Sequence, residues 1–175
     1  MQDIVFDDAA TTTTKTVDFA ITLRPEAPLQ LQLGALTDAT YPPTINHTAY
    51  PPLRRCPIAV SIQTKLPGRN ENQARAQLAV WGAAHLLRLE RMTEQVAPPG
   101  KRPPLPTLPL VLVSGVSWHL YFLALREGEV VMMGSHPLGE TGTLLGAYKL
   151  LHGMRALADW SVTLVRWWEV VVGGF

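Results

Sequence analysis

The chain of 175 residues carries 15 Lys and Arg against 14 Asp and Glu, and 47% of its residues are hydrophobic. This length and apolar content suit one domain with a sizeable core, and they exclude a disordered polyelectrolyte, a collagen-like chain and a disulfide-stapled miniprotein. Because Cys56 is the single cysteine, neither an internal disulfide nor a cysteine-rich zinc site can form, so we expect an intracellular protein, with the nucleus as a candidate compartment.

Two strands and a helix are predicted in the first half of the chain. Residues 15–23 and 57–65 alternate between apolar and polar side chains, which is typical of half-buried strands. The segment between them, residues 24–57, holds seven of the fifteen prolines and is predicted to be loop or extended connection. Residues 70–91 predict a helix, with Asn70 as the N-cap.

The second half is predicted to contain three strands and a second helix. Residues 97–109 hold six prolines and are read as a loop. Strands are expected over residues 108–116, 118–125 and 129–133. A helix follows from about Thr143 to about Asp159, with apolar positions at Leu144, Tyr148, Leu151 and Leu157. Residues 160–172 are compatible with a further helical or extended piece.

One uncharged stretch, residues 108–125, approaches the length of a membrane-spanning helix. It contains Pro109 and a Ser114-Gly115 break, so two buried strands fit better and no membrane span is expected. The order of elements predicts an α/β fold with a central mixed β-sheet flanked by helices, in one domain over residues 1–175. Residues 1–14 are expected to be a poorly ordered start.

Charge is distributed unevenly along the chain. Residues 54–102 hold nine Lys and Arg against three Asp and Glu, whereas residues 1–53 hold two against six. A basic middle segment suits a surface that faces phosphate groups, and it equally suits a solvated, arginine-rich helix. Arg69 and Arg75 are the candidates for contacts to phosphate, and DNA is the candidate partner.

Polar side chains on the first two strands form a possible catalytic set. Gln63 and Lys65 are two residues apart and project to one face, and Asp18 joins them if the strands pair. A carboxylate can hold Mg²⁺, the metal can activate water, and a lysine can stabilise the charge that develops during phosphodiester hydrolysis. Taken alone, this pattern occurs by chance in many chains.

Five motifs in chain order resemble the fungal PD-(D/E)XK nuclease-like domain family. They are KTVDFAI at residues 15–21, INHTAYPPL at 45–53, PIAVSIQTK at 57–65, QLAVWGAAH at 77–85 and GETGTLLGAY at 139–148. The resemblance implies a restriction-endonuclease-like core. The longer N-terminal region of that family, including a first helix, is not apparent in this chain.

The resemblance also implies roles for individual residues. Asp18 matches the first metal-binding acid and Lys65 the catalytic lysine, and the backbone carbonyl of Thr64 would be a further ligand of Mg²⁺. Gln77 matches a helix position that faces the site in related exonucleases. Gln63 stands where the family has its second acid.

The glutamine at position 63 leaves the function open. An amide carries no charge, so Mg²⁺ should bind weakly. The site is then degenerate, or it draws a carboxylate from elsewhere, with Glu71 the nearest candidate in the sequence, or it keeps weak activity with glutamine. The chain is accordingly a weakened metal-dependent deoxyribonuclease or an inactive, nuclease-like binding module.

The loop that holds Asn46 and His47 also has two readings. These residues could contact the site or nucleic acid, and more simply they could tie the loop down through side-chain hydrogen bonds. Trp81 and His85 share one helix face and are expected to pack on the sheet.

Overall fold

The computed structural model describes residues 17–68, 71–98 and 100–173. Five strands form one mixed sheet in the order β1-β2-β3-β4-β5, and all neighbours are antiparallel except the parallel pair β2 and β3. The elements are β1 (Phe19–Thr22), α1 (Ala27–Asp38), η1 (Pro51–Leu53), β2 (Ile58–Lys65), α2 (Glu71–Val96), β3 (Leu108–Ser114), β4 (Ser117–Arg126), β5 (Glu129–Glu140) and α3 (Leu144–Val172).

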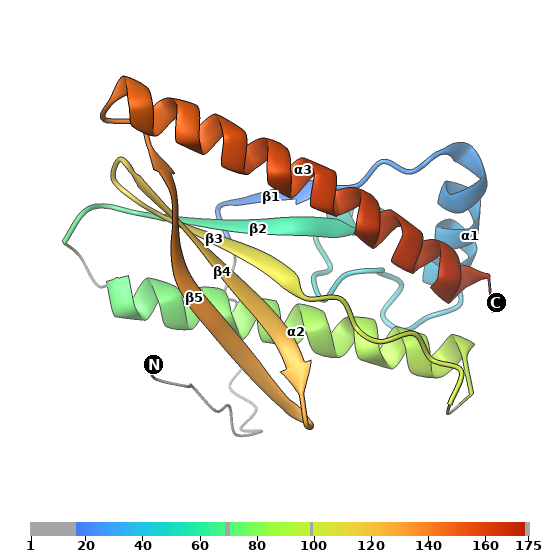
Figure 1. The fold of residues 1–175 in the computed structure, drawn as a ribbon. Helices are drawn as coiled ribbons and strands as arrows, with labels where there is room; N and C mark the ends of the chain where they lie inside the picture. Colours follow the sequence, from blue (N-terminus) through green and yellow to red (C-terminus); the bar gives the residue numbers. More distant parts are fainter. Residues whose placement is uncertain (1–16, 69–70, 99, 174–175) are drawn as a thin grey trace.

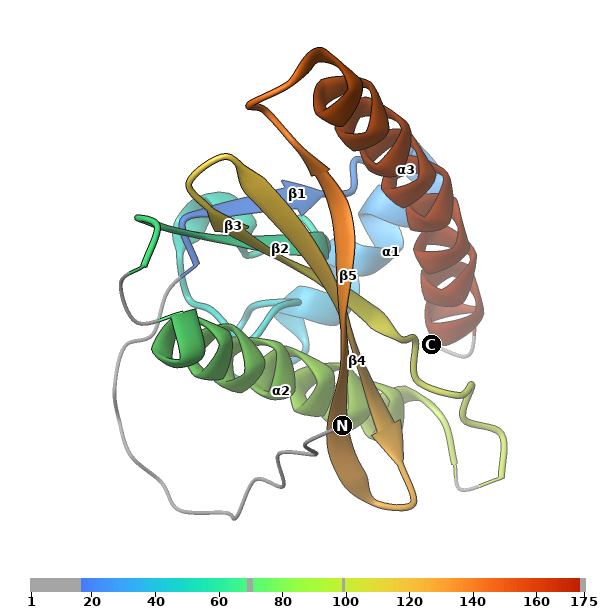
Figure 2. The same cartoon turned by 60° about the vertical axis from the view of Figure 1, so that its left-hand side comes forward.

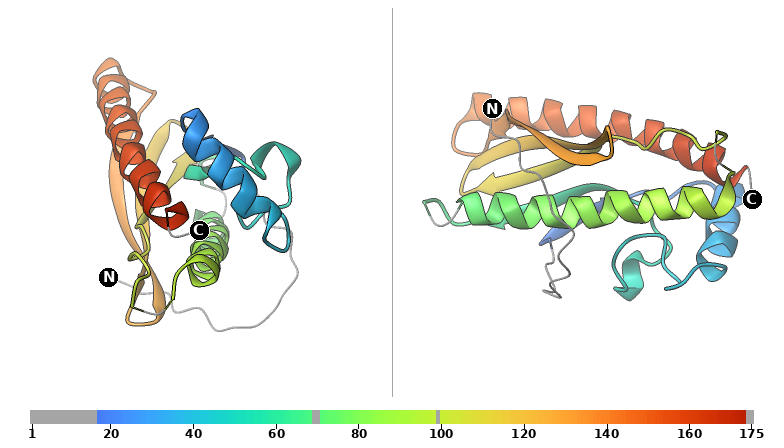
Figure 3. Two further views of the ribbon diagram at one scale, coloured as in Figure 1. Left: turned by 90° about the vertical axis from the view of Figure 1, so that its right-hand side faces the viewer. Right: turned by 90° about the horizontal axis from the view of Figure 1, so that it is seen from below.

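The two long helices cover opposite faces of the sheet (Figure 1). Helix α2 crosses one face and α3 lies over the other, while α1 packs beside the C-terminal part of α3 (Figure 3). The view in Figure 2 shows how strongly β4 and β5 twist away from β1 and β2. This is the α/β fold with a restriction-endonuclease-like core that the sequence predicts.

Helix α1 corrects the prediction of a loop over residues 24–57. Its buried side chains, Leu29, Leu33 and Leu36, follow a helical spacing that the surrounding prolines obscured. Pro28 lies in the first turn, where a missing amide hydrogen costs no intrahelical bond. Beyond α1, the remaining segment is loop apart from the short helix η1.

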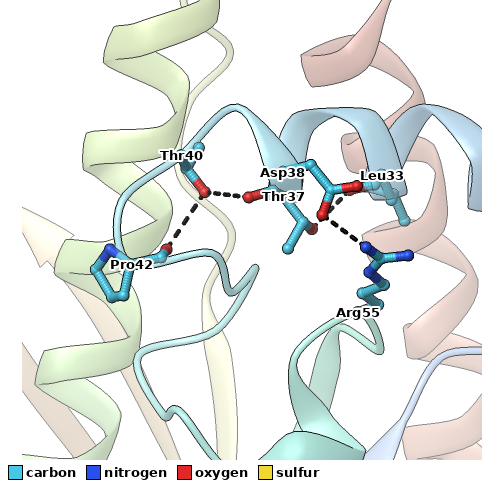
Figure 4. A network of polar contacts seen from close by, with 6 residues as sticks. All are labelled: Leu33, Thr37, Asp38, Thr40, Pro42 and Arg55. Carbon is cyan, nitrogen blue, oxygen red and sulfur yellow. Dashed lines mark hydrogen bonds and ion pairs between the residues drawn. The ribbon is translucent and has the colours of Figure 1, made fainter.

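Side chains close the C-terminal end of α1 (Figure 4). The hydroxyl of Thr37 donates to the Leu33 carbonyl at 2.6 Å, and that of Thr40 donates to the Thr37 carbonyl at 2.9 Å. Arg55 pairs with Asp38 at 2.6 Å and so ties the end of α1 to the segment before β2. These contacts hold a proline-rich connection in one conformation.

The strand and helix boundaries differ from the prediction mainly at C-terminal ends. Strand β5 continues to Glu140 rather than ending near residue 133, because Gly134 and Pro137 are tolerated on an edge strand. Helix α2 continues to Val96, and α3 runs without a break to Val172. The predicted N-cap Asn70 and the start at residues 1–14 lie outside the described residues, as does any helix before β1.

Two predicted apolar faces are only partly buried. Phe19 on β1 is exposed, as are Leu144, Tyr148 and Leu151 at the start of α3, whereas Leu157 is buried. The second half of α3 supplies core residues instead: Trp168 is fully buried, and Trp167 donates from Nε1 to the Pro104 carbonyl at 2.8 Å.

None of the helices in the described part of the chain has an apolar stretch that could cross a membrane.

Candidate functional site

Asp18 lies immediately before β1 and is held by the neighbouring strand. Its backbone N–H donates to the Ile62 carbonyl at 3.1 Å, and the antiparallel register places Phe19 opposite Ile62. Asp18 therefore lies opposite Gln63, and directly opposed residues in antiparallel strands point to the same face. The pairing of the first two strands, on which the predicted catalytic set depends, is present in the structure.

One oxygen of the Asp18 carboxylate accepts three hydrogen bonds. Oδ2 receives the backbone N–H of Thr64 at 2.7 Å, the hydroxyl of Thr64 at 2.7 Å and the amide Nε2 of Gln63 at 2.9 Å. Three donors fill the hydrogen-bonding capacity of this oxygen and stabilise the carboxylate without a cation.

Gln63 is buried, with 4% of its surface exposed. Its Nε2 lies 2.9 Å from Asp18 Oδ2 and 3.5 Å from the backbone carbonyl oxygen of Thr64. These two oxygens are the ones that the family resemblance assigns to a metal ion. The amide group thus presents N–H donors where a cation would sit, because only its NH₂ end can approach a carboxylate favourably.

Lys65 projects to the same face as Gln63, two residues further along β2, and is half-buried. Its ammonium group makes no hydrogen bond or ion pair with any described residue. The structure therefore brings Asp18 and Gln63 into direct contact and leaves Lys65 beside them with a free charge.

Helix α2 places two of the predicted substrate-binding residues, Gln77 and Arg75, on different flanks. Trp81 donates from Nε1 to the Ser61 hydroxyl of β2 at 2.9 Å, so this flank of α2 faces β2. Gln77 lies one turn before Trp81 on the same flank. The four-residue step from Trp81 to Gln77 on the helix and the two-residue step from Ser61 to Gln63 on the strand both span about 6 Å. Gln77 therefore lies level with Gln63.

Arg75 lies on the other flank of α2. It precedes Gly82 by seven residues, and Gly82 packs against Leu110 of β3 and Leu123 of β4. The Nε atom of Arg75 is buried without a hydrogen-bond partner. Arg69 lies outside the described residues, so its place relative to the site stays a prediction.

Glu71 does not complete the site in this arrangement. It accepts a hydrogen bond from the Ser114 hydroxyl at the end of β3, and β3 lies on the side of β2 away from β1. Glu71 and Asp18 are thus directed to opposite sides of β2. Among the described residues, no group of three or more His, Cys, Asp and Glu side chains could hold a metal ion.

The basic excess of residues 54–102 is dispersed rather than gathered at Asp18. Arg55 pairs with Asp38 and Arg102 with Glu94. Arg88 is buried near the far end of α2, about 25 Å along the helix from Glu71. In the described part of the chain, Lys65 and Arg75 are the bases of this segment that lie near the end of β2.

A cavity of about 470 Å³ opens beside Asp18. It lies between β1 and the loop that carries η1, and its walls include Asp18, Phe19, Thr48, Tyr50, Leu53 and Trp81. Sequence reasoning missed this cavity, since the loop and β1 are far apart in the chain. Phe19 and Tyr50 are exposed at its wall, which the sequence pattern did not indicate.

Asn46 anchors the loop beside this cavity. Its side chain is fully buried, donates to the carbonyls of Leu53 and Cys56, and accepts from the Ile58 N–H at 3.1 Å. The simpler reading of Asn46, a residue that ties down the loop, is therefore confirmed.

His47 packs its ring edge-on against Trp81, with ring centroids 4.1 Å apart, and lies 5.2 Å from the ring of His85. Burial lowers the pKa of His47 to about 4. Burial, and secondarily the neighbouring His47, also lower the pKa of His85. Both imidazoles are therefore neutral at pH 7 and act as packing groups.

The mixed sheet places Asp18, just before β1, beside the Q-x-K run of β2, which is the arrangement that the family resemblance implies. The sequence model of the PD-(D/E)XK nuclease superfamily matches residues 2–166, so the chain belongs to this superfamily. No curated protein and no solved structure matches the chain.

PD-(D/E)XK nucleases generally use divalent metal ions, but the residues present here do not fit one. The donor set would comprise the Asp18 carboxylate, the Gln63 amide and the Thr64 carbonyl, with one negative charge between them. Mg²⁺ prefers several hard oxygen ligands and gives up its water reluctantly. In this structure Gln63 turns its NH₂ group, rather than its oxygen, toward the other two.

Proposed function

We propose that this protein is a catalytically silent member of the PD-(D/E)XK nuclease superfamily that binds DNA without hydrolysing it. The observation that carries this proposal is the contact of Gln63 Nε2 with Asp18 Oδ2 and with the Thr64 carbonyl. A neutral amide donates to the oxygens that would otherwise attract Mg²⁺, and it lacks the second negative charge that metal-dependent hydrolysis needs.

A free positive charge on the face of the sheet that holds Asp18 and Gln63 supports DNA binding. Lys65 projects to the same face as Gln63 and has no charged partner among the described residues. A phosphodiester backbone would supply acceptors to the ammonium group of Lys65. An intracellular, nuclear location belongs to the same proposal.

Slow hydrolysis is the second candidate, and one observation favours it. The other carboxylate oxygen of Asp18, Oδ1, accepts no hydrogen bond from the described residues, so it could still bind a weakly held cation. Mg²⁺ binding would then be weak, and activity would require high metal concentrations or Mn²⁺.

One set of variants separates the two candidates. Wild type, Gln63→Glu and Gln63→Glu/Lys65→Ala are compared in Mg²⁺ and Mn²⁺ titrations with a plasmid-nicking assay. Of these three proteins, we expect only Gln63→Glu to nick the plasmid. Metal-dependent nicking by wild type at any rate would overturn catalytic silence, and nicking slower than that of Gln63→Glu is the result that slow hydrolysis predicts.

DNA binding is measured separately in EDTA by fluorescence anisotropy. If two or three phosphates are contacted, log Kd should change with log salt with a slope of about 2 to 3. Lys65→Ala should weaken binding several-fold, and Lys149→Ala on α3 is the matched control. Absence of binding at low ionic strength would refute this part of the proposal.

A further inference from the structure

A second cavity, of about 380 Å³, lies on the flank of α2 beyond Trp81. Its walls come from α2 and from the loop after α1, and they include Tyr41, His47, Arg88, Arg91 and Gln95. The contact between His47 and Trp81 lies between this cavity and the one beside Asp18. Arg88 is seven residues beyond Trp81, about 10 Å along the helix.

Arg88 is buried with only neutral partners. Its Nη2 donates to the Thr40 hydroxyl at 3.1 Å and to the carbonyls of Pro42, at 3.0 Å, and Thr44. These bonds fix the loop after α1, whose residues Thr40 and Pro42 also bond to each other (Figure 4). The Nε atom of Arg88 is buried with no acceptor and no described carboxylate pairs with the guanidinium group, so the charge of this cavity-lining residue is uncompensated.

Arg91 adds a second unpaired charge to the same cavity. It lies three residues beyond Arg88, is exposed, and makes no hydrogen bond or ion pair with any described residue. Burial lowers the pKa of Arg88, and the positive charge of Arg91 lowers it further. The described residues that line the cavity include no carboxylate.

Two adjacent guanidinium groups without a counterion make a site for an oxyanion. Leaving a buried charge unpaired is costly, and a bound anion would offset that cost for Arg88 and the repulsion between the two arginines. Guanidinium groups match the oxygens of phosphate with paired, charge-assisted hydrogen bonds. His47 also lines the cavity, and as a neutral imidazole it has one N–H group to donate.

We propose that this cavity binds a phosphate group, with Arg88 and Arg91 as its charged ligands. The phosphate comes either from a nucleic-acid backbone or from a small phosphorylated molecule. Binding here does not depend on the proposed function, because neither arginine lies near Asp18 and neither takes part in the contact between Gln63 and Asp18.

The test uses the full chain in EDTA, with inorganic phosphate, pyrophosphate and a single-stranded ten-nucleotide DNA as separate probes. Calorimetry and thermal unfolding are measured for wild type, Arg91→Gln and Arg91→Lys. Arg155→Gln, an exposed position on α3, is the matched control. We expect pyrophosphate to bind wild type and Arg155→Gln equally, Arg91→Gln to lose at least tenfold in affinity, and Arg91→Lys to recover part of the loss.

The probes distinguish the two sources of phosphate. Pyrophosphate binding that the oligonucleotide does not displace indicates a small phosphorylated ligand, whereas oligonucleotide binding that weakens in Arg91→Gln indicates a nucleic-acid backbone. Lys65→Ala should leave pyrophosphate binding unchanged. This result distinguishes binding in the cavity from binding on the face of the sheet that holds Asp18 and Gln63. Failure of all three probes to bind wild type at millimolar concentration, or equal binding by Arg91→Gln, would overturn the proposal.

Discussion

The amide nitrogen of Gln63 donates to the carboxylate of Asp18 across 2.9 Å, between residues that are 45 positions apart in the chain. In a site of this kind, a carboxylate at position 63 would instead repel Asp18 unless a cation lay between them. The glutamine therefore stabilises the metal-free protein at the expense of the anionic pair that Mg²⁺ needs.

Gln63→Glu should make stability depend on metal. In EDTA the variant should lose about 2 kcal/mol, because a donor becomes a like charge and one of the two carboxyl pKa values rises. Millimolar Mg²⁺ should restore the loss. Thermal unfolding with and without Mg²⁺ measures both effects.

Gln63→Met is the control for that experiment. It removes the hydrogen bond to Asp18 without adding charge, so it should be destabilised in both buffers alike. If Gln63→Glu shows no response to Mg²⁺ while it remains folded, the idea that position 63 alone prevents metal binding is wrong.

Asn46→Ala should destabilise the protein by about 3 kcal/mol, since three buried backbone groups lose their partner. The exposed Asn72→Ala, near the start of α2, should change stability by no more than about 0.5 kcal/mol. Urea denaturation of both variants measures the difference. Equal effects would mean that the loop does not depend on the Asn46 side chain.

Acid should destabilise the protein through the buried histidines. The folded pKa of His47 is about 4, below its ordinary value of 6.5, so the unfolded chain binds the extra proton first. The stabilisation is complete above pH 6.5 and is lost as the pH falls toward 4, by on the order of 3 kcal/mol from His47.

His47→Phe keeps a ring against Trp81 but cannot titrate. Its free energy of unfolding should therefore fall less than that of wild type between pH 6.5 and 4.5, with the remaining dependence due in part to His85. Urea denaturation at several pH values tests this. An identical slope in both proteins would show that His47 is not the group responsible.

Gly139→Ala should be strongly destabilising. The backbone of Gly139 has φ of +150°, and a Cβ there would lie 2.4 Å from the Leu150 backbone nitrogen, where β5 meets α3. Gly128→Ala is the control, because its φ of +84° is also positive but a Cβ would meet open space. We expect about 1 kcal/mol for the control and at least twice that for Gly139→Ala, measured by thermal unfolding.

Local patterns were sufficient for most strands and helices. Alternation located β2 over Ile58–Lys65, and the Ser114-Gly115 break separated β3 from β4. The pattern failed where flanking prolines outweighed a helical repeat, as in α1, and where an edge strand tolerated glycine and proline, as in β5. In both cases tertiary contacts rather than local preference decided the outcome.

The sequence by itself determined the superfamily, the class of fold and the residue types at positions 18, 63 and 65. Only the tertiary structure decided that Gln63 donates to Asp18, that Glu71 is engaged by Ser114, and that Arg88 is buried beside Arg91. These contacts depend on strand register and on how a helix is rotated against a sheet. Register and rotation are set by packing between segments far apart in the chain, which local side-chain patterns do not encode.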